Sequence, residues 1–187
     1  MKNYRYIWVA IFTIPLNLKI FILLFLIPGL SITWAQSDTR ATIDSFEHYI
    51  SQSKNNTDFN LNTRLSYALK AKKIANKLAL DSLIIQSNFK VSELELESGF
   101  NDLFLKTTKE NLKLATRIKD TSSMALIYSH LGDYYDRQIT DSAYYYYHKS
   151  EKLYGALKDY YNTALSLLDI AIIQKNEKDF TGSEVTS

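Results

Sequence analysis

The sequence predicts an all-α protein built from repeated pairs of helices, and three observations support this fold class. The 187 residues contain only two prolines, both before residue 36, and five glycines, a composition that disfavours a turn-rich β architecture. Apolar residues make up 46% of the chain and recur at helical spacing through most of its length. Asp81, Asp120 and Asp159 lie 39 residues apart, which indicates an internal repeat.

Residues 1–35 have the parts of a secretory signal peptide. The basic start "MKNYR" is followed by an apolar run, a Pro-Gly break and the small residues Thr33 and Ala35. We therefore expect cleavage between Ala35 and Gln36 and a periplasmic or exported protein. The alternative is an uncleaved segment that anchors the chain to the inner membrane, which would be its only contact with a membrane.

The charge of the chain after residue 35 argues against a nucleic-acid partner. Lys2, Arg5 and Lys19 are lost with the signal peptide, which leaves 19 basic and 20 acidic residues. Binding to a phosphate backbone requires a basic field, which this part of the chain lacks. The chain has no cysteine, so disulfides and thiolate chemistry are excluded.

Each repeat unit is predicted to begin at its aspartate, which would cap the first of two helices. In the first unit, the first helix ends at Gly99, although residues 91–98 alternate like a strand, and the second helix follows Asp102. In the middle unit, Asp141 is the candidate cap of the second helix. Before these units come an N-terminal helical segment at 36–60 and a helix whose apolar positions include Leu65, Ala68, Ala75 and Leu78.

The middle unit resembles a tetratricopeptide repeat. The stretch "YSHLGDYY" places an aromatic residue, a Leu-Gly pair and a tyrosine at the spacing of that family's first helix, and the second helix has its small, aromatic, small pattern. The resemblance covers residues 61–187 and is weaker in the first unit, where Glu93 stands at the register of Gly132. The matching residues of the middle unit are Tyr128, Leu131, Gly132, Tyr135, Ala143, Tyr147 and Ser150.

The resemblance implies a TPR-like α-solenoid of about three stacked antiparallel helix pairs, the last repeat being incomplete. In such a solenoid the first helices line a groove that binds a peptide or partner protein. By register with the family, Leu126, Ser129, Asp133 and Asp136 would face this groove.

Similar arrays follow a signal sequence in bacterial sensor histidine kinases and helix-turn-helix regulators. We therefore expect an exported protein-interaction or sensory scaffold for signal transduction. The alternative is a non-functional truncated remnant of such a kinase or regulator.

The last predicted helix, 160–175, is almost wholly apolar and has no following helix to cover it. We expect Leu165, Leu168 and Ile172 to form an exposed apolar patch, through which the chain could self-associate.

The run of tyrosines at 144–147 could be a binding platform or a packing face. Consecutive helical residues point about 100° apart, so four in a row cannot form one flat surface. We expect Tyr146 and Tyr147 to pack, Tyr144 to face a neighbouring unit and Tyr145 to face solvent.

Other residues suggest no catalytic or metal chemistry. His48, His130 and His148 lack the spacing of metal ligands, and no nucleophile, phosphate-loop or kinase motif occurs. Lys70, Lys73 and Lys77 form a basic stripe that is predicted to be a solvated face. We therefore expect no enzyme activity, no cofactor and no metal.

Overall fold

The computed structural model describes residues 39–136 and 138–177, so the predicted signal peptide and its cleavage site at Ala35 and Gln36 lie outside the described residues. Within these ranges the chain forms seven helices and no strand, which confirms the all-α class. None of these described helices combines the length and hydrophobicity needed to cross a membrane. The helices are 39–54, α3 (Leu61–Leu78), α4 (Asp81–Glu97), α5 (Asn101–Ile118), α6 (Thr121–Asp136), α7 (Thr140–Leu157) and α8 (Tyr160–Asn176).

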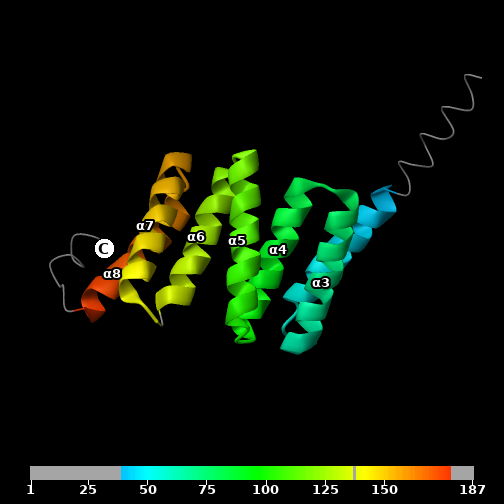
Figure 1. Ribbon diagram of the computed structural model, residues 1–187, viewed down its shortest axis with the longest axis horizontal. Coiled ribbons are helices and arrows are strands. Elements are labelled where there is room, and N and C mark those ends of the chain that lie inside the picture. The colour runs from blue at the N-terminus through cyan, green and yellow to red at the C-terminus, as the bar shows by residue number, and fades with distance from the viewer. Residues whose placement is uncertain (1–38, 137, 178–187) are drawn as a thin grey trace, which may run out of the picture. The chain divides into compact units, whose positions relative to one another are not determined.

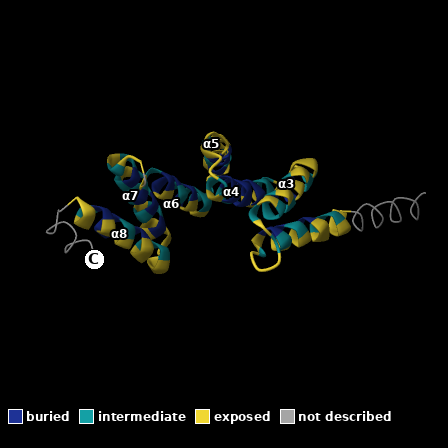
Figure 2. Cartoon of the chain, turned by 90° about the horizontal axis from the view of Figure 1, so that it is seen from below, coloured by how far each residue is buried: buried dark blue, intermediate teal, exposed yellow. Residues whose placement is uncertain are grey.

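Successive helices from α3 to α8 pack side by side in chain order (Figure 1). These helices belong to the second of the two compact units of the chain, Ser45–Ser187. This unit also contains the part of the helix 39–54 from Ser45 onward, where Phe46 and Ile50 pack with Ala71 and Ala75 of α3. In addition α4 contacts α6, while α5 stands out from the line of these two helices (Figure 2). Thus α4 and α6 are the first helices of neighbouring pairs, and α5 and α7 are the second helices.

The repeat is marked by three helix ends with left-handed backbone. Ala79, Lys119 and Lys158 have φ of 52°, 59° and 59° and terminate α3, α5 and α7. These residues are 40 and then 39 residues apart, and the helices that follow begin at 81, 121 and 160. The structural repeat therefore differs by one residue from the constant spacing of the aspartates.

This difference decides which aspartates cap a helix. The Asp120 carboxylate accepts from the Ser123 amide at 3.0 Å, and that of Asp159 accepts from the Asn162 amide at 3.1 Å, as predicted. The prediction was wrong for Asp81, because Leu80 occupies the cap position and Asp81 lies in the first turn of α4. Its carboxylate is paired instead with Arg117 at 2.9 Å, which links the start of α4 to the end of α5.

The second helix of the middle unit also begins without a side-chain cap. Ile139 occupies the cap position of α7, and Asp141 lies in the first turn, so the predicted capping role of Asp141 was wrong. An acidic residue in the first turn still interacts favourably with the positive end of the helix dipole.

Two equivalent hydrogen bonds, one inside each pair, show which residues of the two pairs correspond. The Ser150 hydroxyl donates to the Ala125 carbonyl at 3.0 Å, and the Asn111 side-chain amide donates to the Ile85 carbonyl at 3.2 Å. Residues of α4 therefore correspond to residues of α6 that are 40 positions further along the chain. By this register the counterpart of Gly132 is the buried Ser92, so the prediction that Glu93 takes that position was wrong.

The strand-like alternation at 91–98 covers the last turns of the helix α4 and its C-cap, Ser98. This helix contacts α3, α5 and α6, so it is buried on several sides and its apolar residues need not follow a single stripe. Val91 and Leu94 are buried, but so are Ser92 and Glu95. The helix ends as predicted at Gly99, whose φ is 75°. The amide of Phe100 donates to the Glu95 carbonyl at 2.9 Å, which completes a Schellman motif.

The tyrosine run packs largely as predicted. Tyr147 is 4% exposed and lies against Gly132, where an added Cβ would be 2.5 Å from the ring. Tyr146 is half-buried, and its ring is stacked on that of Tyr135 at 5.4 Å. Tyr144 packs against a cluster that includes residues of α8, and Tyr145 is 52% exposed. The run is therefore a packing face and not a platform.

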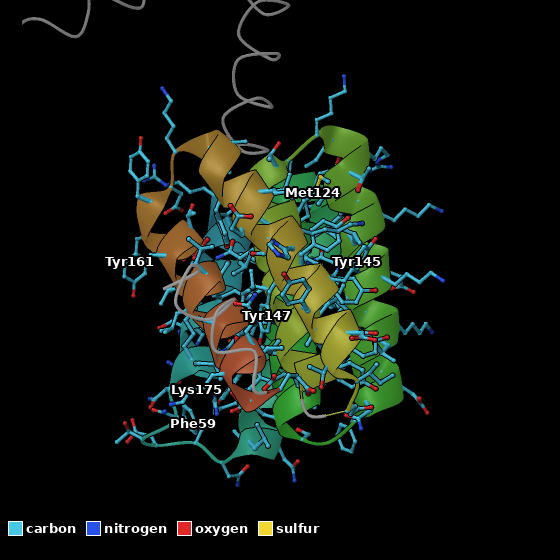
Figure 3. All side chains as sticks on the ribbon, turned by 90° about the vertical axis from the view of Figure 1, so that its left-hand side faces the viewer. Phe59, Met124, Tyr145, Tyr147, Tyr161 and Lys175 are labelled. Carbon is cyan, nitrogen blue, oxygen red and sulfur yellow. The ribbon has the colours of Figure 1, made fainter. Side chains whose placement is uncertain are left out.

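The last helix, α8, buries one side and exposes another. Ile170 and Ile173 are buried, whereas Leu165, Leu168 and Ile172 are 42%, 52% and 46% exposed. The predicted exposure of these three residues is confirmed. Tyr161, on the same helix, projects into solvent (Figure 3).

Candidate functional site

The repeat register identifies a shared exposed face on the first helices. On α6 the predicted groove positions Leu126, Ser129 and Asp133 are at least partly exposed. Their counterparts on α4 lie 40 residues earlier in the chain. Their counterparts on α8 lie 39 residues later, because α8 begins 39 residues after α6. All nine side chains are at least partly exposed, and we call this set the first-helix face: Gln86, Phe89, Glu93, Leu126, Ser129, Asp133, Leu165, Leu168 and Ile172.

A cavity of about 310 Å³ opens between helix 39–54, α4 and α6, and we call it the α4–α6 cavity. Its volume is at the lower end of the range for ligand-binding cavities, roughly 300–1,000 Å³. The helices 39–54, α4 and α6 each contribute apolar and polar side chains to its wall, and α5 contributes one residue, Asn111. The lining residues are Ile50, Lys54, Ser82, Ile85, Gln86, Phe89, Lys90, Glu93, Asn111, Asp120, Ser123, Leu126 and Ile127.

Asn111 is the most buried polar side chain of this cavity wall, with 1% of its surface exposed. Its side-chain nitrogen is used in the hydrogen bond to Ile85, but its carboxamide oxygen accepts no hydrogen bond from any described residue. A buried acceptor without a donor costs about 1–3 kcal/mol. The Asn111 oxygen is therefore a buried, unpaired acceptor that is closed to solvent.

Three of the four charged side chains in this wall already have a partner. The ammonium of Lys90 lies 3.0 Å from the Glu93 carboxylate, and Asp120 is occupied by its cap to Ser123. Lys54 is exposed and makes no ion pair within the part of the chain that the structure describes.

A second cavity, of about 510 Å³, adjoins the first at Glu93, which lines both. His130 and Asp133 contribute to its wall from α6. The His130 ring lies 4.2 Å from that of Phe89, centroid to centroid. Burial lowers the pKa of His130, against the opposing effect of the charges of Asp133 and Glu93, so this imidazole favours its neutral form.

Carboxylates of α6 and α8 gather at the other end of the first-helix face. Burial, together with the negative charges of Asp133 and Asp136, raises the pKa of Asp169 to about 6. The Tyr147 hydroxyl donates to the Asp133 carboxylate at 2.8 Å, so the packing tyrosine also holds an exposed residue of the face. Burial and the Asp133 charge raise the pKa of Tyr147, which stays a phenol.

The four predicted groove residues are all on α6 but lie in different surroundings. Leu126 lines the α4–α6 cavity and Asp133 lines the second cavity, whereas Ser129 and Asp136 line neither. The residues that match the family pattern are buried or half-buried: Leu131, Gly132, Ala143, Tyr147 and Ser150 are buried, and Tyr128 and Tyr135 are half-buried.

Several residues of the cavity were not anticipated from the sequence. Ile50 and Lys54 lie on the helix 39–54, within the helical segment predicted at 36–60, but no local pattern places them beside α4 and α6. Asn111 gave no signal, because its role depends on a contact 26 residues away.

The histidines and the basic stripe have ordinary surroundings. His48 is exposed, and Nδ1 of His148 lies 3.6 Å from the Glu151 carboxylate. Lys70, Lys73 and Lys77 are exposed, as predicted for a solvated face. Among the described residues, no three His, Asp or Glu side chains are arranged to hold a metal ion.

Comparison with known proteins gives no family assignment. No family model matches the sequence, and no curated protein is significantly similar to it.

Proposed function

We propose that this chain is a TPR-like solenoid that binds a peptide or an extended segment of a partner protein along its first-helix face. The observation that carries the proposal is that equivalent positions of α4, α6 and α8 are all accessible to solvent. In stacked helix pairs, the first helices form the continuous surface on which such partners lie. The contact between α4 and α6, and the cavity between them, supports this arrangement.

The chemistry of the face suits a peptide with apolar side chains. Leu126, Leu165 and Leu168 are each between 38% and 52% exposed. Covering the exposed half of such a side chain contributes about 1 kcal/mol of binding free energy. Three or four contacts of this kind, with polar contacts at the rim, would give a specific complex of moderate affinity.

Selection from a random peptide library displayed on phage, followed by fluorescence anisotropy with a selected peptide, tests this proposal. Leu168→Asp should weaken binding about tenfold or more, because the partner would bury an unpaired charge. Leu103→Asp is the matched control, since Leu103 is 51% exposed but lies on the second helix α5. Equal losses in the two variants, or a library that yields no binder, would refute the proposal.

We further propose that the protein is exported and that its mature form begins at Gln36. The support is the signal-peptide pattern of residues 1–35. Mass spectrometry of protein recovered from the periplasm of a Gram-negative host tests this directly. An intact Met1 in the membrane fraction would instead favour an N-terminal anchor.

A further inference from the structure

The charged residues of the repeat are divided between its two kinds of helix. Helix α3 ends in the same left-handed way as α5 and α7, so it is a second helix. It has five basic residues and no acidic one, whereas α5 has four and two and α7 has two of each. The first helices α4, α6 and α8 together contain two basic and seven acidic residues. The near-neutral charge of the chain after residue 35 therefore conceals basic second helices and acidic first helices.

One basic residue recurs at the same position of every second helix. Lys73 of α3, Lys113 of α5 and Lys152 of α7 are 40 and 39 residues apart, the spacing that also separates the ends of these helices. All three side chains are exposed, and α3, α5 and α7 lie on the same side of α4 and α6 (Figure 2). The basic stripe of α3, predicted to be a solvated face, therefore continues onto two more helices.

Most of the cations on these helices have no carboxylate partner. Arg117 pairs with Asp81 at 2.9 Å, and Lys70 and Lys149 each lie over two tyrosine rings. Six other exposed lysines make no ion pair within the part of the chain that the structure describes. We call these six the second-helix face: Lys73, Lys77, Lys106, Lys109, Lys113 and Lys152. An anionic partner can approach them without breaking an internal ion pair.

Apolar side chains stand among these lysines. By the repeat register, Leu69 of α3 takes the place of Lys109, and Tyr145 of α7 takes the place of Lys106. Leu69 is 48% exposed and Tyr145 is 52% exposed. Leucine and tyrosine beside lysine are typical of protein surfaces that enter the boundary between lipid headgroups and acyl chains. An anionic bilayer offers phosphate groups to the lysines and an apolar boundary to these two side chains.

A hollow of about 620 Å³ on α5 lies within this face. Lys109, Lys113 and Arg117 line it together with the half-buried Leu112. Glu110 is the carboxylate in its wall and opposes these cations. With three cations against one carboxylate, the hollow suits the phosphate group of a lipid, and Leu112 suits the first methylenes of its chains.

We propose that the second-helix face docks on the anionic surface of a phospholipid bilayer. The lysines are distributed over three helices, so an extended layer of anions fits them better than one small anion. Each lysine near such a surface strengthens association about fivefold. The proposal does not depend on the proposed function, since the first-helix face belongs to other helices. From the sequence alone, residues 1–35 were expected to provide the only contact with a membrane.

Co-sedimentation of the purified protein with vesicles tests the proposal. Vesicles of phosphatidylcholine alone are compared with vesicles of phosphatidylcholine mixed with the anionic lipid phosphatidylglycerol. An uncleaved apolar segment would insert into both, so the measured quantity is the preference for the anionic vesicles. We expect binding to these vesicles to be about a hundredfold tighter or more, and this preference to be lost in about 1 M salt, which screens the charges. Equal binding to the two kinds of vesicle would overturn the proposal.

Variants locate the attraction on the molecule. Lys73→Gln, Lys113→Gln and Lys152→Gln combined should reduce the affinity for anionic vesicles about a hundredfold. Lys113→Glu alone should reduce it about thirtyfold, whereas Lys175→Glu, which changes the net charge equally, should reduce it less than about threefold. Lys175 is exposed on the first helix α8. Equal losses in the two single variants would place the attraction in the net charge of the protein and would overturn the proposal.

Two further measurements decide whether the anionic partner is a bilayer. Leu69→Ser and Tyr145→Ser combined should weaken vesicle binding about tenfold, because both side chains lose their contact with the apolar boundary. Unchanged vesicle binding in this variant would overturn the assignment. Binding to polyglutamate or to double-stranded DNA that is as tight as binding to anionic vesicles would show a face for acidic polymers in general, and it would also overturn the assignment to a bilayer.

Discussion

Replacing Gly132 by alanine should destabilise the protein, even though alanine is the better helix former. Gly132 lies inside α6, and a Cβ there would be 2.5, 2.6 and 2.9 Å from three ring carbons of Tyr147. The ring is 4% exposed, and its hydroxyl is fixed by the 2.8 Å hydrogen bond to Asp133. It therefore cannot yield by a small rotation without losing packing or that bond.

The magnitude follows from three terms. Overpacking in a dense core costs about 1–3 kcal/mol. Loss of a hydrogen bond to a charged acceptor costs about 1.5–3 kcal/mol. The gain in helix propensity from glycine to alanine is about 1 kcal/mol and opposes both. The free energy of unfolding should therefore fall by about 1.5–5 kcal/mol, measured from urea titration of the helical circular dichroism signal.

Two comparisons make this prediction sharp. Gly155 lies inside α7 with no atom within 4 Å of an added Cβ, so Gly155→Ala should instead stabilise the protein by about 0.5–1 kcal/mol. In a Tyr147→Ala background, Gly132→Ala should also become stabilising, because the ring that it strikes is gone. If Gly132→Ala raised the unfolding midpoint in the unaltered background, the packing of Tyr147 on Gly132 would be refuted.

Three further predictions address packing, charge and backbone. Tyr147→Ala should lower the free energy of unfolding by about 3 kcal/mol and Tyr145→Ala by about 0.5 kcal/mol or less, so urea midpoints that ranked them in reverse would contradict the helix phase. The pKa of Asp169 is about 6 in the folded protein and about 3.9 in the unfolded chain. Protonated Asp169 therefore stabilises the fold fully below about pH 3.9, and this contribution is lost as the pH rises through 6. Asp169→Asn should therefore raise stability at about pH 7.5, by about 1 kcal/mol after allowance for its partial exposure, and leave it unchanged at about pH 3, where the same urea titration checks it. Lys119→Gly should stabilise the protein by about 0.5–1 kcal/mol, because Lys119 has a φ of 59°, which glycine adopts without strain. Lys152→Gly, in the interior of α7, should destabilise it by about 1 kcal/mol. Equal shifts of the thermal midpoint in the two variants would contradict this explanation.

The exposed residues of α8 illustrate how the structure changed the meaning of a correct prediction. The sequence predicted that Leu165, Leu168 and Ile172 would form an exposed apolar patch, and they are exposed. The repeat register shows that they also match Leu126, Ser129 and Asp133 of α6, the residues expected to line a groove. The same three side chains are therefore candidates for partner binding. The apolar pattern of the sequence predicts their exposure but does not reveal this role.

The sequence by itself determined the features that depend on near neighbours in the chain. Helical spacing, the caps at Asp120 and Asp159, the left-handed Gly99 and the burial of Tyr147 could each be predicted, because their causes lie within a turn or two of helix or in a resemblance to a known repeat. The class of fold followed from these local signals repeated along the chain.

Only the tertiary structure decided the register between the pairs and the composition of the cavity. A repeat of 40 residues followed by one of 39 makes Leu80, not Asp81, the equivalent of Asp120, and the equal spacing of the aspartates concealed this. Asn111 meets Ile85 across 26 residues of sequence, and Ile127 stands where the next pair has Ser166. These contacts arise from how whole helices pack, and a single extra residue shifts every side chain on a helix by about 100°, so no local pattern specifies them.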